Sequence, residues 1–176
     1  MDIEVKMGDL VVTKSPDNLM ASGIGSCLVI TLYDPKRKIG ALAHSMLPNC
    51  PPSYTVRDAS NPIRKTKDTK HKTYDTISNT QYEVQIGKYA DVAIDEMLKR
   101  MKFLGAKRED LEAKLTGGAN MFAGFESDIG KENFLRAKER LKKEGVKIVG
   151  ESIGGSIGRS VEFSVASGIL TVKVKF

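Results

Sequence analysis

The chain has no tryptophan, only two cysteines and two histidines among its 176 residues, and no long apolar run. Two cysteines in a chain of this length do not form a disulfide framework, so we expect reduced thiols and a cytoplasmic protein. Because no stretch of about 18 residues is wholly apolar, no membrane insertion is expected. The N-terminal MDIEVKMGDL contains acidic residues and no apolar core, so it is not a secretory signal. The cysteines and histidines lack metal-ligand spacing, and we expect neither a metal site nor a cofactor.

The excess of positive charge is concentrated in one segment. The net charge is +6, and residues 57–72 hold six basic and two acidic residues, a local charge of +4. This segment belongs to a polar stretch, residues 49–86, which has no clear periodicity and is too long for an ordinary connection. The stretch is therefore a functional flap, an ordered excursion or a disordered insertion. Aromatic residues do not alternate with the basic ones, as base stacking requires, so a solvated basic loop is favoured over nucleic-acid binding.

Hydrophobic patterning predicts a strand-rich α/β chain with about seven or eight strands and two main helices. Apolar residues at helical spacing indicate helices over residues 88–104 and about 130–144, and Asp128 is a candidate N-cap for the second helix. The predicted strands cover residues 9–13, 27–33, 39–47, 111–116, 146–151, 160–165 and 169–176.

The residues best suited to chemistry lie in a predicted hairpin. Cys27 opens its first strand directly after the glycine-rich turn at 23–26, and His44 lies in its second strand. If the turn at 34–37 pairs its first and last residues, Cys27 lies directly opposite His44, with Cβ atoms roughly 4.5–5.5 Å apart. A register shifted by one residue would put Ser45 opposite Cys27 and move His44 to the other face.

A facing thiol and imidazole can perform nucleophilic catalysis. The imidazole favours the reactive thiolate by accepting its proton, and it then protonates the leaving group. Gly25 and Ser26 are the candidates for the turn and for an oxyanion hole that uses backbone N–H groups. The alternative is that Cys27 is a small buried apolar residue and His44 a core histidine; the residues alone leave the two interpretations about even. Cys50 has no nearby base.

Six short motifs occur in order along the chain: GSC at 25–27, AHSMLP at 43–48, GKYAD at 87–91, GGANMF at 117–122, IG at 129–130 and GRSV at 158–161. Together they resemble the CheD family, the chemoreceptor glutamine deamidases of bacterial and archaeal chemotaxis. The resemblance implies an α/β fold, a β-rich layered sandwich with two main helices, similar to the deamidase domain of cytotoxic necrotising factors. It implies one CheD-like domain over residues 1–176, from whose usual pattern the basic loop-like insertion at about 50–86 departs, because relatives usually have a shorter connection there.

The resemblance also implies an activity. CheD-like proteins are protein-glutamine glutaminases: they hydrolyse glutamine side-chain amides of methyl-accepting chemoreceptors to glutamate and release ammonia, and some act on receptor glutamate methyl esters. By position, Cys27 matches the family nucleophile and His44 its base. A CheC-type phosphatase is the implied protein partner, with no role for nucleic acid.

One position departs from the family pattern. The family usually has threonine six residues before the cysteine, where it orients the imidazole, whereas this chain has Ala21. The adjacent Ser22 would point to the opposite side of a strand. The third catalytic position thus falls on Ala21 or Ser22, and a backbone carbonyl could orient the ring instead. The departure supports an alternative function, a weakly catalytic or non-catalytic regulatory adaptor that binds receptors and binds and stimulates a CheC-type phosphatase.

Overall fold

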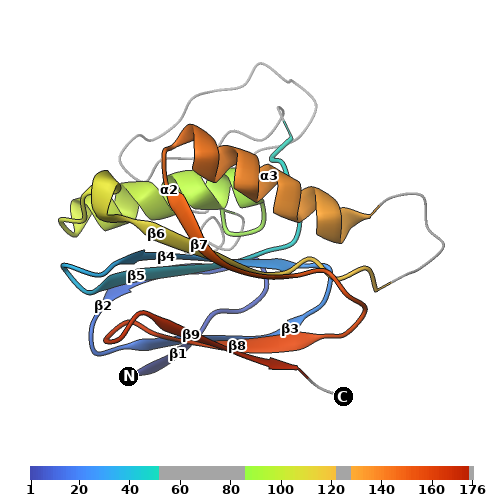
Figure 1. The fold of residues 1–176 in the computed structure, drawn as a ribbon, viewed down its shortest axis with the longest axis horizontal. Helices are drawn as coiled ribbons and strands as arrows, with labels where there is room; N and C mark the ends of the chain where they lie inside the picture. Colours follow the sequence, from blue (N-terminus) through green and yellow to red (C-terminus); the bar gives the residue numbers. More distant parts are fainter. Residues whose placement is uncertain (52–85, 122–127, 175–176) are drawn as a thin grey trace, which may run out of the picture.

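The computed structural model describes residues 1–51, 86–121 and 128–174, and the fold has three layers (Figure 1). Two helices cover one face of a five-stranded sheet, and a four-stranded sheet covers its other face. The mixed α/β, strand-rich class with two main helices is thereby confirmed for the described residues. Most of the predicted insertion at 50–86, including the basic segment, lies outside them. No described helix is long and apolar enough to cross a membrane.

The chain crosses between the two sheets several times, because several pairs of successive strands belong to different sheets. The five-stranded sheet has the order β2-β5-β4-β6-β7 and is antiparallel except for the parallel pair β6–β7. The four-stranded sheet has the order β1-β3-β8-β9. The strands are β1 (Asp2–Glu4), β2 (Leu10–Lys14), β3 (Asn18–Ile24), β4 (Leu28–Asp34), β5 (Ile39–Ser45), β6 (Glu112–Gly117), β7 (Lys147–Ile153), β8 (Arg159–Ser164) and β9 (Ile169–Val174). The helices are α2 (Ala90–Phe103), the short 3-10 helix η1 (Arg108–Asp110) and α3 (Ile129–Lys143).

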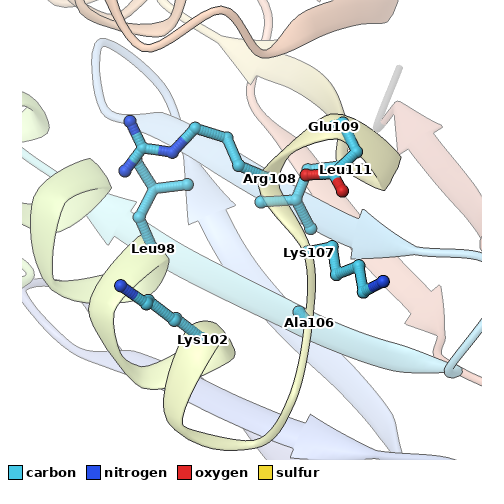
Figure 2. Close-up of a pocket in the computed structure, with 7 residues that line it drawn as sticks. All are labelled: Leu98, Lys102, Ala106, Lys107, Arg108, Glu109 and Leu111. Atoms are coloured by element: carbon cyan, nitrogen blue, oxygen red, sulfur yellow. The ribbon is translucent and has the colours of Figure 1, made fainter.

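A pocket of about 380 Å³ opens where α2 ends and η1 begins (Figure 2). Leu98 and Lys102 line it from α2, and Lys107 and Arg108 line it from the following segment. The backbone N–H of Lys107 donates to Asp34 Oδ2 at 3.4 Å. Asp34 ends β4, so the pocket lies at the opposite end of this strand from Cys27 and is separate from the predicted site.

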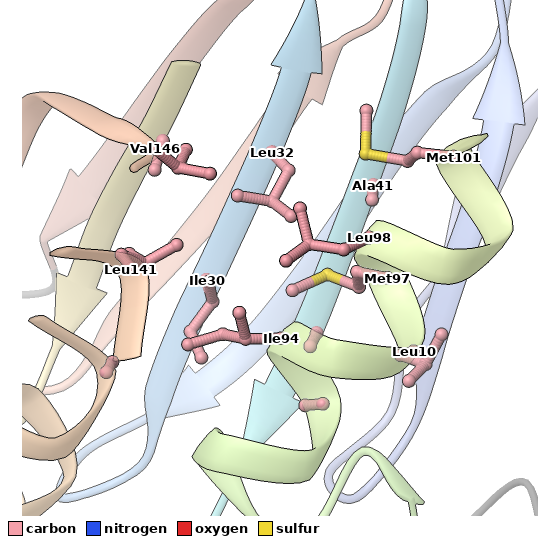
Figure 3. Packing of buried hydrophobic residues seen from close by; sticks show 14 of the residues in the cluster. Leu10, Ile30, Leu32, Ala41, Ile94, Met97, Leu98, Met101, Leu141 and Val146 are labelled. Atoms are coloured by element: carbon pink, nitrogen blue, oxygen red, sulfur yellow. The ribbon is translucent and has the colours of Figure 1, made fainter. Parts of the chain in front are cut away.

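Strand β4 is buried along its whole length because both of its faces contribute to a core. Ile30 and Leu32 pack under the helices, among residues such as Ile94 and Met97 of α2 (Figure 3). Val29, on the opposite face, belongs to a second core between the two sheets. This double burial explains why the strand reads as a continuous apolar run rather than as an alternating one.

The hairpin register predicted from the sequence is wrong by two residues. Val29 lies opposite His44, the position that the sequence predicts for Cys27. A shift of two residues keeps every side chain on its predicted face, because strand side chains alternate with a period of two. Cys27 directly precedes β4, and its carbonyl accepts from the Gly118 N–H at 2.8 Å, which extends the β4–β6 pairing by one residue. Cys27 and His44 are therefore diagonal neighbours on one face, not directly opposed residues.

The Asp34 carboxylate sets the observed register. Asp34 pairs with Ile39, so the loop encloses four residues instead of two. Its Oδ1 accepts from the backbone N–H groups of Lys36 and Arg37, each at 3.0 Å, and its Oδ2 accepts from the Arg37 guanidinium at 2.9 Å. These bonds turn the Arg37 side chain back onto Asp34. They satisfy the turn without an Asp34–Arg37 strand pair.

Candidate active site

Cys27 lies at the end of the central strand, under a methionine. Its side chain is 9% exposed, and its Sγ atom lies 3.6 Å from the Sδ atom of Met7, which is 53% exposed. Burial raises the pKa of the thiol, and the residue's own backbone N–H opposes that shift. Free cysteine has a pKa of about 8.5, so Cys27 is a protonated thiol near neutral pH.

His44 is a buried, uncharged base in the core between the sheets. It lies two residues beyond Leu42, a member of that core, and its side chain is 1% exposed. Burial lowers the pKa of the imidazole, while the nearby Val5 backbone and Asp9 carboxylate oppose the shift. Neither ring nitrogen has a hydrogen-bond partner among the described residues. The ring is therefore in the neutral form that accepts a proton, and it makes no hydrogen bond to Cys27.

The His44 backbone is held more firmly than its ring. Its N–H donates to the Asp9 carbonyl at 3.0 Å, and its carbonyl accepts from the Gly8 N–H at 2.8 Å. The next residue, Ser45, donates its hydroxyl to the Gly87 carbonyl at 2.8 Å. Gly87 packs so closely against Gly8 and Asp9 that a Cβ atom there would overlap their backbone. The first residue of the GKYAD motif therefore supports the strand that carries His44.

Ala21 and Ser22 lie on opposite sides of β3. Ala21 is buried in the core between the sheets, the core that His44 also faces, whereas Ser22 is exposed. A bulge follows directly, since Ala21 pairs with Val161 and the next paired residue of β3 is Ile24. Neither Ala21 nor Ser22 brings a hydroxyl to the imidazole.

The backbone around Gly25 and Ser26 is fixed through its carbonyl groups. The Gly25 carbonyl accepts from the Ala119 N–H at 2.9 Å, and the Ser26 carbonyl accepts from Asn133 Nδ2 at 3.0 Å. In a trans peptide, the C=O and the following N–H point in opposite directions. The N–H group of Ser26 therefore points away from Ala119, and the N–H group of Cys27 points away from Asn133.

The loop after β6 supports the Cys27 backbone from the other side. Gly117 has a φ of +117°, and a Cβ atom there would overlap the Cys27 carbonyl oxygen, so glycine is required. Arg159 binds the Gly117 carbonyl through Nη1 at 3.0 Å and the Gly154 carbonyl through Nη2 at 2.6 Å. The GGANMF and GRSV motifs thus meet beside the predicted nucleophile.

Sequence reasoning missed Met7 and Asn133. Nothing in the local pattern places Met7 on the Cys27 thiol, because the two residues come from different segments. Asn133 does leave a signal: it occupies the buried face of α3 together with Ala137 and Leu141, at helical spacing. An amide at such a core position indicates a specific hydrogen-bonding role.

The structure brings no metal site to these residues. No group of three or more His, Cys, Asp or Glu residues within the described part of the chain could hold a metal ion. The second cysteine, Cys50, is partly buried beside α2, and its backbone N–H donates to the Asp91 carboxylate at 3.1 Å.

Comparisons with known proteins agree with the motifs. The family model described as CheD chemotactic sensory transduction matches residues 74–174. The probable chemoreceptor glutamine deamidase CheD of Methanococcus vannielii is 39% identical over 175 residues, which cover 98% of this chain and 95% of that protein. The chemoreceptor glutamine deamidase CheD of Thermotoga maritima is 35% identical over 169 residues, 96% of this chain and 89% of that protein. On the strength of these matches, the chain belongs to the CheD family.

Proposed function

We propose that this protein is a chemoreceptor glutamine deamidase, a protein-glutamine glutaminase with Cys27 as nucleophile and His44 as base. The observation that carries the proposal is that Cys27 directly precedes β4, in which Val29 pairs with His44. Strand alternation continued by one residue puts the thiol diagonal to the neutral imidazole, on one face of the hairpin. Methyl-accepting chemoreceptors are the proposed substrates, because the relatives are named for that activity.

The proposed reaction has two halves. In the first, His44 takes the proton from Cys27 Sγ, the thiolate attacks the glutamine amide carbon, and the N–H groups of Ser26 and Cys27 bind the oxyanion. His44 then protonates the amide nitrogen, which leaves as ammonia, and a thioester remains. In the second half, water attacks the thioester, giving glutamate and restoring the Cys27 thiol. Met7 covers the sulfur in this structure, so the substrate must displace its exposed side chain.

The proposal extends to the whole chain. One deamidase domain spans residues 1–176, with the basic stretch at about 50–86 as an insertion. The two free cysteines, Cys27 and Cys50, support a cytoplasmic location, where thiols stay reduced. The layered arrangement of helices and two sheets supports the similarity to the deamidase domain of cytotoxic necrotising factors.

The test is ammonia release from a receptor fragment that contains the modification helices. We expect Cys27→Ala to abolish the release and Cys50→Ala, the matched control, to retain it, with mass mapping of glutamine-to-glutamate changes as a second measurement. Both variants should keep the wild-type unfolding midpoint, because the Cys27 side chain is small. If ammonia release survives Cys27→Ala but stops in Cys50→Ala, the nucleophile is Cys50 and the proposed role of Cys27 is wrong.

A second candidate function rests on the site itself. Ala21 supplies no hydroxyl to orient the imidazole, and burial keeps Cys27 in its less reactive thiol form. Both observations favour a weakly catalytic or non-catalytic adaptor that binds receptors and binds and stimulates a CheC-type phosphatase. The same assay separates the two functions: an adaptor binds the receptor fragment and the phosphatase without releasing ammonia.

A further inference from the structure

The strands that carry Cys27 and His44 separate at the point where the site lies. Leu28 and Ser45 form the last pair of the β4–β5 ladder. Beyond it, the N–H groups of Met46 and Leu47 both donate to the Lys88 carbonyl, at 2.9 and 3.0 Å. The residues before Leu28 turn instead toward the loop after β6. There the N–H groups of Gly118 and Ala119 donate to the carbonyls of Cys27 and Gly25. No ladder bond therefore fixes the two branches relative to each other beyond Leu28 and Ser45.

One side chain bridges this fork. The Nδ2 atom of Asn133 donates to the Ser26 carbonyl and to the Met46 carbonyl, each at 3.0 Å. Ser26 directly precedes Cys27, and Met46 follows His44 by two residues. Because both partners are carbonyl oxygens, the amide orientation is determined by chemistry: only the NH₂ group can serve both.

The surroundings of Asn133 favour a hydrogen-bonding role over an apolar packing role. The residue is completely buried on α3, on the face that otherwise contributes Gly130, Ala137 and Leu141. Gly130, one turn earlier, lies against the backbone of Gly118, where a Cβ atom would come within 2.6 Å of the carbonyl carbon. The first turns of α3 are thus docked directly on both branches of the fork.

We propose that Asn133 is a positioning residue, which holds the Cys27 and His44 segments at the separation that proton transfer requires. The inference rests on the proposed roles of Cys27 and His44. Asn133 makes no hydrogen bond to the imidazole; it acts through the Ser26 and Met46 carbonyls. Through the Ser26 carbonyl it also fixes the peptide plane whose N–H belongs to Cys27, one of the two donors assigned to the oxyanion.

The test compares Asn133→Leu with Leu141→Ala. Asn133→Leu keeps a side chain of similar shape and removes both donors, whereas Leu141→Ala weakens the same buried helix face two turns away from the fork. We expect Asn133→Leu to lower kcat for ammonia release by on the order of 10- to 100-fold with little change in KM, because misplacement by about 1 Å costs that much. Leu141→Ala should lower the unfolding midpoint and leave kcat unchanged. Asn133→Gln, which retains the NH₂ group, should keep more activity than Asn133→Leu.

A second measurement does not depend on deamidation. The rate of Cys27 alkylation by iodoacetamide, followed against pH in a Cys50→Ala background, reports how readily the thiol loses its proton. We expect Asn133→Leu to move this profile to higher pH, since the imidazole is no longer held near the sulfur. If wild type alkylates with the expected profile but releases no ammonia, the proposed function fails while the positioning role stands.

Two results would overturn the inference. One is a folded Asn133→Leu variant whose kcat and alkylation profile match those of wild type. The other is an equal loss of kcat in Leu141→Ala, which would mean that Asn133 matters only for the stability of α3. Should Asn133→Leu fail to fold, Asn133→Ala gives the same comparison, because it removes the donors without adding a branched carbon.

Discussion

Burial acts on Cys27 and His44 in the same sense, because it favours the uncharged form of each. It raises the pKa of the thiol and lowers the pKa of the imidazole. Proton transfer from sulfur to nitrogen creates two charges in this buried site, and the protein has to stabilise both of them. Within the described residues, the Val5 backbone and the Asp9 carboxylate favour the protonated imidazole, but no side chain is hydrogen-bonded to either ring nitrogen.

We predict that Ala21→Thr increases the rate of deamidation. Ala21 lies in the core that His44 faces, and neither ring nitrogen there has a hydrogen-bond partner among the described residues. A threonine hydroxyl would orient the ring, and we expect kcat to rise on the order of tenfold, less than a complete acid–base group contributes. Stability should fall by about 1–3 kcal/mol, because two atoms are added to a packed core. Single-turnover ammonia release and urea unfolding measure the two effects.

Ser22→Thr is the matched control, since Ser22 is adjacent and exposed. It should change neither the rate nor the stability. A folded Ala21→Thr variant with wild-type kcat would show that the orientation of the imidazole does not limit the reaction.

Single residues could be predicted where their chemistry was visible in the sequence. Cys27 and His44 were predicted from residue type and a strand pattern, and their catalytic roles stay predictions; the two-residue error in the register leaves His44 on its predicted face. Asn133 and Arg159 could not be assigned, because each binds backbone carbonyls from distant segments. Asn133, for example, is separated from Ser26 by 107 positions.

At the scale of elements, helices and buried strands were predicted well and irregular strands were not. The apolar runs of β4 and β5 and the helical spacing of α2 and α3 produce elements within a few residues of the predicted bounds. Strand β3 was missed because residues 23–26 were predicted as a glycine-rich turn; in the structure a bulge between Ala21 and Ile24 lies inside a strand. The register depended on how Asp34 is hydrogen-bonded, which the turn sequence alone does not determine.

The N-cap of α3 gives a prediction at this scale. Asp128 accepts a hydrogen bond from the Lys131 N–H at 3.0 Å, as the sequence predicts. Asp128→Ala removes this acceptor, and we expect the free energy of unfolding to fall by about 0.5–2 kcal/mol in urea titrations. Asp128→Asn keeps a capping oxygen and should lose much less. Equal stability of wild type and Asp128→Ala would mean that other groups satisfy the first turn of α3.

At the scale of the whole molecule, stability is linked to the protonation of His44. Burial lowers the pKa of the imidazole in the folded protein, so on acidification the unfolded chain binds a proton first, at its ordinary pKa of about 6.5. The contribution of the neutral ring to stability is therefore fully present above about pH 6.5. It is lost as the pH falls from there through the lower pKa of the folded state.

We predict that His44→Gln removes this part of the pH dependence. The free energy of unfolding of wild type should decrease between about pH 6.5 and pH 5, where a normal histidine becomes charged. His44→Gln should show a smaller slope, whatever its absolute stability. The chain contains one other histidine, His71, and His71→Gln is the control that should keep the wild-type slope. Urea unfolding at closely spaced pH values measures these slopes. Equal slopes of the free energy of unfolding against pH for wild type and His44→Gln would exclude His44 as the source of the pH dependence.

The wide separation of the site's supporting residues has a consequence for synthesis of the chain. A ribosome makes the protein from its N-terminus, so Cys27 and His44 appear early. Asn133, which bridges their segments, follows 107 residues after Ser26, and Arg159 belongs to the next-to-last strand. Until β8 has been made, β3 lacks its antiparallel neighbour and the Gly117 carbonyl lacks its guanidinium. Catalytic competence is therefore a property of the finished chain: a translation product that stops before β8 has the thiol without the contacts that fix its backbone.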